Sequence, residues 1–128
     1  MEAVYVGSVV IDCNDFSTML AFWQEALGYV PKYPPKENDW ALLIDPRGEH
    51  VNVSLQCVPE KRIGKNRLHL DLYAEDPDAE VERLLKLGAK RFDRVPEPGE
   101  DFVVLEDPEG NLFCVVDVRE SADSDRDA

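Results

Sequence analysis

A histidine and an aspartate two residues apart are the side chains of this chain best suited to chemistry. His69 and Asp71 lie in the segment 67–73, where apolar and polar residues alternate as in a half-buried strand. Residues two apart in a strand project from the same face, so we expect the two side chains to lie together with Tyr73. The carboxylate can orient the imidazole as a general base or as a donor that anchors a ligand. The alternative is a structural histidine whose hydrogen bonds serve only the sheet.

The segment with this pair belongs to an internal repeat. Residues 39–48 (DWALLIDPRG) reappear as residues 101–110 (DFVVLEDPEG), at an offset of 62 because 101 − 39 = 62. Segments on either side recur at a similar offset, which indicates two copies of one supersecondary unit. We therefore expect modules at 4–58 and 67–118 within a single domain that covers residues 1–120.

Each module is predicted to contain a strand, a helix and three further strands. The helices have apolar residues at helical spacing and end at Gly28 and Gly88. The expected strands are 4–13, 29–33, 39–44, 51–58, 67–73, 90–94, 101–106 and 112–118, and the expected helices are 16–27 and 78–87. The predicted fold class is α+β: two βαβββ modules forming a cupped, mixed and mostly antiparallel sheet with the helices outside. The acidic tail, residues 121–128, is predicted to be disordered.

The face of the sheet opposite the helices is the predicted ligand site. Polar side chains alternate there with apolar ones, and ligand sites are usually concave faces with a few converging polar groups. Beside His69 and Asp71, the predicted ligand-binding residues are Ser8, Asp12, Ser54, Gln56, Tyr73 and Cys114. An ordinary solvent-exposed sheet face would show a similar pattern. Trp23 is assigned to the core, whereas Trp40 and Phe102 either line the rim of the cup or pack beneath the sheet.

Composition argues against several classes of protein. The formal net charge of −13 disfavours binding to nucleic acid or anionic membranes, because such binding needs clustered Lys and Arg. No apolar run approaches the roughly 20 residues of a membrane span, and no signal peptide is visible, so a cytoplasmic location is expected. The three cysteines are widely spaced and include no Cys-x-x-Cys pair, so neither a disulfide framework nor a thiolate zinc site is indicated.

The doubled unit resembles the vicinal oxygen chelate superfamily, which includes glyoxalase I, bleomycin- and fosfomycin-resistance proteins and extradiol dioxygenases. The resemblance rests on Asp15-Phe16, Ala21-Phe22-Trp23, Leu27-Gly28, RLHLDL at 67–72 and DPEGNL at 107–112. It covers roughly residues 4–118 and implies the glyoxalase/bleomycin resistance/dioxygenase fold. It also implies a homodimer with a site at the seam between modules.

The resemblance further implies a metal site to which each module supplies two ligands. Carried over by position, the first-strand places hold Ser8 and His69, and the last-strand places hold Cys114 and either Asn52 or Ser54. Of these, only His69 is a good ligand for metals that prefer imidazole and carboxylate oxygen. A divalent metal is therefore disfavoured and no cofactor is expected. The alternative is an improvised set of His69, Asp71 and Asp12.

Together, the residues and the resemblance favour a small-molecule binding protein without the glyoxalase I metal site. His69, Asp71, Tyr73 and Gln56 would hold an organic ligand, and the acidic composition suits a cationic or polyhydroxylated one. One alternative is a lyase, isomerase or dioxygenase that acts on a small oxygenated substrate, with a metal or with acid–base chemistry at His69 and Asp71. The other is a dimeric interaction module whose cup is vestigial.

Overall fold

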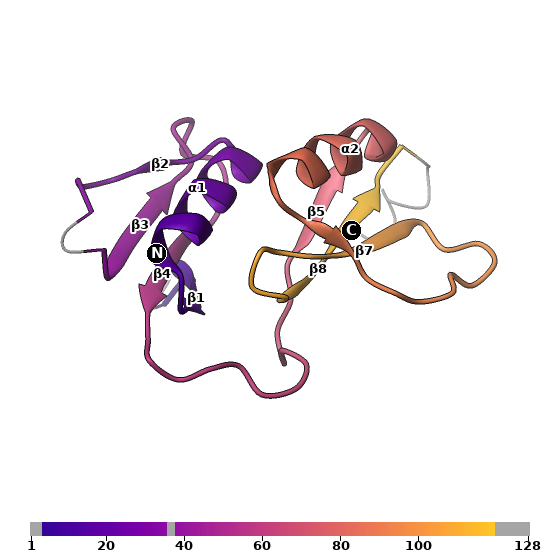
Figure 1. Cartoon of the computed structure of the whole chain (residues 1–128). Coiled ribbons are helices and arrows are strands. Elements are labelled where there is room, and N and C mark those ends of the chain that lie inside the picture. Colours follow the sequence, from indigo (N-terminus) through magenta and orange to yellow (C-terminus); the bar gives the residue numbers. More distant parts are fainter. Residues whose placement is uncertain (1–3, 36–37, 120–128) are drawn as a thin grey trace. The chain divides into compact units, whose positions relative to one another are not determined.

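The computed structural model describes residues 4–35 and 38–119, and the acidic tail at 121–128 lies outside these ranges. The chain divides between Arg62 and Ile63 into two compact units (Figure 1). Each unit contains a four-stranded sheet with one helix lying across it.

The first unit follows the order strand, helix and three strands. Its elements are β1 (Ser8–Cys13), α1 (Phe16–Leu27), β2 (Val30–Pro31), β3 (Trp40–Ile44) and β4 (Asn52–Cys57). The strands lie in the order β1-β4-β3-β2, with β1 parallel to β4 and the other neighbours antiparallel.

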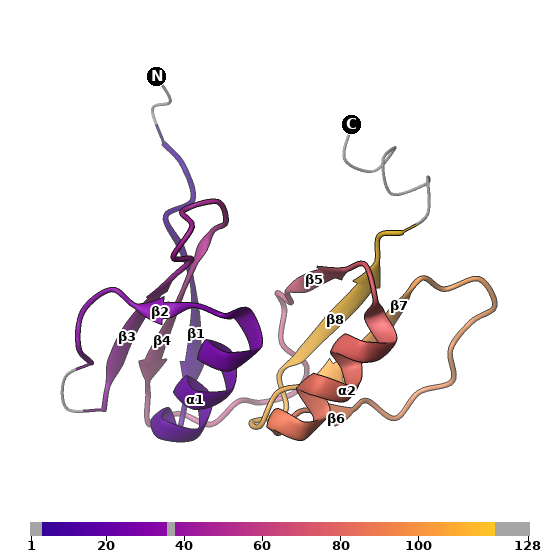
Figure 2. The same cartoon turned by 90° about the horizontal axis from the view of Figure 1, so that it is seen from above.

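The second unit repeats this arrangement, as Figure 2 shows for β5, β8, β7 and α2. Its elements are β5 (Asp71–Ala74), α2 (Pro77–Leu87), β6 (Lys90–Arg91), β7 (Phe102–Glu106) and β8 (Leu112–Asp117). The order is β5-β8-β7-β6, and β5 and β8 pair in parallel, whereas the other neighbours in this sheet are antiparallel. The predicted α+β fold of two βαβββ modules is confirmed, whereas the cupped seam between the modules stays a prediction.

Both helices begin and end at residues suited to those positions. Asp15 and Asp76 are the N-caps, and their carboxylates accept from the backbone N–H of Thr18 at 3.3 Å and of Ala79 at 3.2 Å. Gly28 ends α1 at a φ of 69°, a left-handed conformation that glycine adopts without strain. Neither helix described here is long and apolar enough to cross a membrane.

Each helix buries one apolar face against its own sheet. In the first unit Met19, Phe22 and Trp23 of α1 are buried, as are Leu43 and Leu55 of the sheet. The corresponding buried residues of the second unit are Val81, Leu84, Leu105, Phe113 and Val115. The assignment of Trp23 to the core is confirmed, since 1% of its surface is exposed.

The strands β1 and β5 are shorter than predicted. Val4 to Val6 precede β1 and are exposed, because β4 begins at Asn52, opposite Ser8, and offers them no partner. In the segment 67–73, the chain pairs as a strand only from Asp71 onward. Leu68 is 81% exposed, so the expectation that the apolar residues of 67–73 form the buried face of a strand was wrong at this position. His69 consequently lies just before β5 rather than within it.

The two Asp-Pro-x-Gly turns share one hydrogen-bonding pattern around a buried carboxylate. Asp45 accepts from the backbone N–H of Arg47, Glu49 and His50 at 3.0–3.2 Å. Asp107 accepts from the backbone N–H of Glu109 and Asn111, and from the Asn111 side chain, at 2.9–3.0 Å. Side chains that bond the backbone two or more residues ahead stabilise tight turns, which explains why this motif recurs in both hairpins.

Candidate functional site

A cavity of about 420 Å³ lies on the face of the second sheet that points away from α2. Val104 of β7 lies opposite Cys114 of β8, so both side chains project from this face. The apolar lining comes from Phe92, Phe102, Val104, Leu112 and Val116, and the polar lining from Lys65, His69, Asp71, Arg94, Asp101 and Cys114. Small-molecule sites typically have this size and this mixture of apolar walls and a few polar groups.

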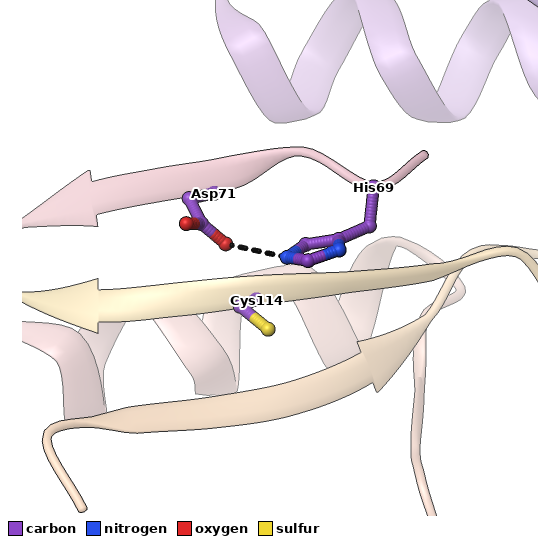
Figure 3. Close-up of side chains that lie close together, drawn as sticks. All are labelled: His69, Asp71 and Cys114. Atoms are coloured by element: carbon purple, nitrogen blue, oxygen red, sulfur yellow. Dashed lines mark hydrogen bonds and ion pairs between the residues drawn. The ribbon is translucent and has the colours of Figure 1, made fainter. Parts of the chain in front are cut away.

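His69 and Asp71 form a hydrogen-bonded pair at the edge of this cavity (Figure 3). The imidazole Nε2 lies 3.0 Å from Oδ1 of the carboxylate, and both side chains are 47% exposed. When Asp71 is ionised and the imidazole is neutral, Nε2 is the donor and Nδ1 is left as an acceptor, because an ionised carboxylate only accepts hydrogen bonds. The pair can therefore offer a ligand an oriented imidazole nitrogen that accepts a proton or a hydrogen bond.

Backbone contacts with β8 hold the segment that carries His69. The Asn66 side chain accepts from the Leu112 backbone N–H at 2.9 Å and donates to the carbonyls of Leu68 and Leu112. One residue after His69, the Leu70 carbonyl accepts from the Cys114 N–H at 2.9 Å. His69 lies between these two fixed points, so it stays beside β8 although it is outside the regular strand.

Cys114 is the third polar side chain of the cluster in Figure 3. One ligand atom each from His69, Asp71 and Cys114 lies within 4.8 Å of the other two. Burial raises the pKa of the Cys114 thiol, and the charge of Asp71 and a hydrogen bond to it raise this pKa further. Cys114 is therefore a neutral thiol near pH 7, which makes it a weak nucleophile at rest.

The loop between β6 and β7 forms another side of the cavity. Arg94 donates through both terminal guanidinium nitrogens to Glu100, at 2.9 and 2.7 Å, and its Cζ lies 5.6 Å from the centre of the Phe102 ring. The sequence predictions for site residues did not include Arg94, Lys65, Phe92 or Asp101. The repeat of Asp39-Trp40 as Asp101-Phe102 was a sequence pattern that could have drawn attention to Asp101. The position of Arg94 depends on the path of an irregular loop, which no such pattern reports.

The first unit has serines at the places that His69 and Cys114 take in the second. Leu42 lies opposite Ser54, and Val104, which is 62 residues after Leu42, lies opposite Cys114. Ser54, rather than Asn52, is thus the counterpart of Cys114. In the parallel pairs, Val10 lies opposite Ser54 and Asp71 lies opposite Cys114, so Val10 and Asp71 occupy equivalent positions. Ser8 and His69, which come two residues before them, are therefore equivalent as well. The Ser8 and Ser54 hydroxyls lie 2.6 Å apart and Ser54 is fully buried.

The remaining predicted site residues are not among those that line the cavity. Asp12 and Gln56 are exposed and lie opposite each other on β1 and β4. Tyr73 projects from β5 with 57% of its surface exposed. Of the two aromatic residues left open, Phe102 lines the cavity and Trp40 is 43% exposed on β3.

The comparisons with known proteins agree with this fold. A family model described as a glyoxalase-like domain matches residues 8–116. The chain belongs to this glyoxalase-like domain family. Solved structures of the glyoxalase/bleomycin resistance/dioxygenase group share its fold, whereas the search of curated proteins gives no match.

Three of these structures illustrate the range of proteins that share the glyoxalase-like fold. A glyoxalase/bleomycin resistance protein/dioxygenase family enzyme from Burkholderia phytofirmans is 19% identical over 90% of this chain and 99% of its own, with a TM-score of 0.71. A fosfomycin resistance protein from Listeria monocytogenes, complexed with Mn(II) and a dihydroxypropylphosphonic acid, is 17% identical over 91% of this chain and 90% of its own, with a TM-score of 0.69. The bleomycin-binding protein from Streptomyces verticillus, complexed with copper(II)-bleomycin, is 17% identical over 91% of this chain and 98% of its own, with a TM-score of 0.61.

The residues at the inherited metal places of this glyoxalase-like chain do not fit a glyoxalase-type metal. Ser8 and Ser54 offer two neutral hydroxyls that already bond each other. In the second unit, the Cys114 thiol occupies one of these places, and its pKa is raised rather than lowered. Nitrogen and carboxylate oxygen are the donors that such metals prefer, and His69 alone among these four places supplies one.

Proposed function

We propose that this protein binds a small organic molecule in the cavity of its second unit, without a glyoxalase-type metal. The apolar side chains of β7 and β8 would take the body of the ligand, and Nδ1 of His69 would accept a hydrogen bond from it. The observation that carries this proposal is the His69–Asp71 pair, 3.0 Å apart, on the lining of a cavity of about 420 Å³. The bleomycin-binding relative supports it, because that protein of the same fold binds a small molecule.

A fragment screen followed by NMR tests this proposal directly. Fragments of fewer than about 20 non-hydrogen atoms match the volume of the cavity, and their binding should shift backbone amide signals of β7, β8 and residues 66–71. The variant Val104→Trp fills the cavity and should abolish these shifts, whereas Val30→Trp, on exposed β2, should keep them. Hits that shift only other regions, or that bind the Val104→Trp variant unchanged, would contradict the proposal.

An enzyme is the second candidate, and the close grouping of His69, Asp71 and Cys114 is the observation that favours it. With Asp71 accepting from Nε2, His69 could remove a proton from a small oxygenated substrate through Nδ1. Lyase and isomerase reactions need such a base. Incubation of the fragment hits with the protein in D2O separates the two candidates, because a base that acts at carbon exchanges a ligand C–H for deuterium and a binding protein does not.

The proposal also includes a homodimer, as the family resemblance led us to expect. Light scattering on the full chain checks it, with a mass near 29 kDa expected because the monomer is 14.5 kDa.

A further inference from the structure

The cavity of the second unit contains two cations although the chain as a whole is strongly acidic. Lys65 and Arg94 both line it, in a protein with a formal net charge of −13. The charges of both residues act to lower the pKa of the Cys114 thiol, so they interact electrostatically with the cluster of His69, Asp71 and Cys114. The carboxylates of Asp71 and Asp101 line the same cavity, so the formal charges of its lining sum to zero, whereas the chain as a whole carries −13.

One of the two carboxylates of the lining, Asp71, is already engaged by a neighbouring donor. Asp71 accepts a hydrogen bond from His69 Nε2 at 3.0 Å. It has less capacity for a cationic ligand than its charge suggests, because one of its acceptor sites is in use. This weakens the expectation, drawn from composition, that the ligand is cationic.

Arg94 is held in place while part of its donor capacity stays free. Glu100 takes one hydrogen bond from each terminal nitrogen, and the Phe102 ring lies beside the guanidinium. A guanidinium has five N–H donors, so three remain for other acceptors. Since the side chain is 29% exposed, those donors can meet a ligand without first leaving Glu100.

Lys65 supplies a cation of a different kind. Among the described residues, its ammonium group makes neither a hydrogen bond nor an ion pair, and the residue is exposed at the mouth of the cavity. A lysine of this kind is a mobile charge on a flexible stem, whereas Arg94 is a fixed planar fork. A mobile cation and a fixed one on the same cavity are suited to an oxyanion.

We propose that the cavity selects ligands that carry a carboxylate or phosphonate group on a small apolar body, with Lys65 and Arg94 as the residues that recognise the oxyanion. Phe92, Phe102 and Val104 would contact the apolar body. This inference rests on the proposed function and adds the chemical class of the ligand. It predicts a preference opposite to that expected from the net charge of the chain.

Four probes that share one phenyl ring and differ in charge test this inference. Benzoate and phenylphosphonate are anions, benzamide is neutral and benzylammonium is a cation. Titrations followed by NMR on the full chain should give an affinity for the better anion on the order of tenfold above that for benzamide, equivalent to one charge-assisted hydrogen bond. The tighter of the two anions then identifies the ligand as a carboxylate or as a phosphonate.

Variants assign the preference to the named residues. Lys65→Gln should weaken binding of that anion about three- to fivefold, as for a partly exposed ion pair, and leave benzamide binding unchanged. Arg94→Met should remove the preference for the anion, provided that its NMR spectrum outside the loop 92–101 matches that of the wild type. Lys90→Gln is the charge-matched control, because Lys90 is exposed on β6 outside the cavity lining, and it should change neither affinity.

The outcomes separate failure of this inference from failure of the proposed function. Equal binding of all four probes in the cavity, or tighter binding of benzylammonium, would overturn the oxyanion preference and leave the cavity as a ligand site. An anion preference that survives in both Lys65→Gln and Arg94→Met would also overturn it. If neither these probes nor any fragment shifts the signals of the cavity residues, both proposals are wrong.

Discussion

Ser54 and Cys114 occupy equivalent places in the two units, yet their surroundings differ in kind. Ser54 is fully buried and its hydroxyl bonds Ser8 at 2.6 Å. Cys114 lines a cavity beside His69 and Asp71. The two copies of one backbone arrangement thus hold a pair of hydrogen-bonded hydroxyls in the first unit and a cluster of titratable side chains in the second. This difference places the candidate chemistry in the second unit.

We predict that Asp71→Asn lowers the pKa of Cys114. The negative charge of Asp71 helps to raise this pKa, so its removal stabilises the thiolate relative to the thiol. Alkylation of Cys114 by iodoacetamide at pH 7 to 8 should then become faster, and peptide mass spectrometry distinguishes this thiol from Cys57 and Cys13. Asp93→Asn, at an exposed position, is the control. A Cys114 rate that stays at the wild-type value would show that Asp71 does not control the thiol.

The purified protein is predicted to contain no stoichiometric zinc, nickel, manganese or iron. Three of the four inherited ligand places hold Ser8, Ser54 and Cys114, and the two serines bond each other. Elemental analysis of protein prepared without a metal-affinity tag measures this. A bound divalent ion at a ratio near one, absent from a His69→Ala variant, would contradict the prediction and move the enzyme to first place.

The buried carboxylate of Asp107 is predicted to stabilise the second hairpin. It is 1% exposed and accepts three hydrogen bonds from Glu109 and Asn111. Asp107→Ala removes the acceptor of these partly buried donors, so the free energy of unfolding should fall by about 1–3 kcal/mol. Denaturant unfolding checks this, with the exposed Asp93→Ala as the control. Equal stability of the two variants would mean that water replaces Asp107 without loss.

Acid should destabilise the protein through carboxyl groups whose pKa is depressed in the folded state. Hydrogen bonds from the Arg119 side chain lower the pKa of Asp117 to about 2, and the backbone N–H of Arg47 is the main cause of the lowered pKa of Asp45. A depressed pKa adds stability that is present above the unfolded value and is lost as the pH falls through the folded value. Unfolding free energies should thus decline from about pH 4 towards pH 2. Asp117→Asn should reduce this decline, and an identical pH profile in that variant would contradict the assignment.

Much of the fold could be predicted because the pattern of this sequence is local and repeated. Asp15 and Gly28 bound α1 as their capping preferences indicate. Alternation also placed Cys114 on the face of the sheet opposite the helix, where it lines the cavity, and its neighbours Phe113 and Val115 are buried on the other face.

What the sequence did not reveal depends on the path of irregular segments. The first hairpin has seven residues between strands (45–51) and the second has five (107–111), so the offset of 62 changes to 60 at Ser54 and Cys114. The alternation of residues 67–73 suggested a longer strand, but β5 pairs with β8 only from Asp71 onward. Arg94 reaches the cavity through a loop whose course is set by Glu100 and Phe102, contacts that no periodic pattern reports.

The central claim is that His69 serves a ligand and not the fold, and one variant tests it most directly. In His69→Ala, the affinity for the tightest fragment from the screen should fall by about 1–3 kcal/mol, in keeping with the loss of one polar contact. The free energy of unfolding should change much less, because the imidazole is 47% exposed and the core of its unit lies on the other face of the sheet. His50→Ala, at an exposed histidine of the first hairpin, is the matched control and should alter neither quantity. A lower melting temperature with unchanged binding in His69→Ala would contradict the account.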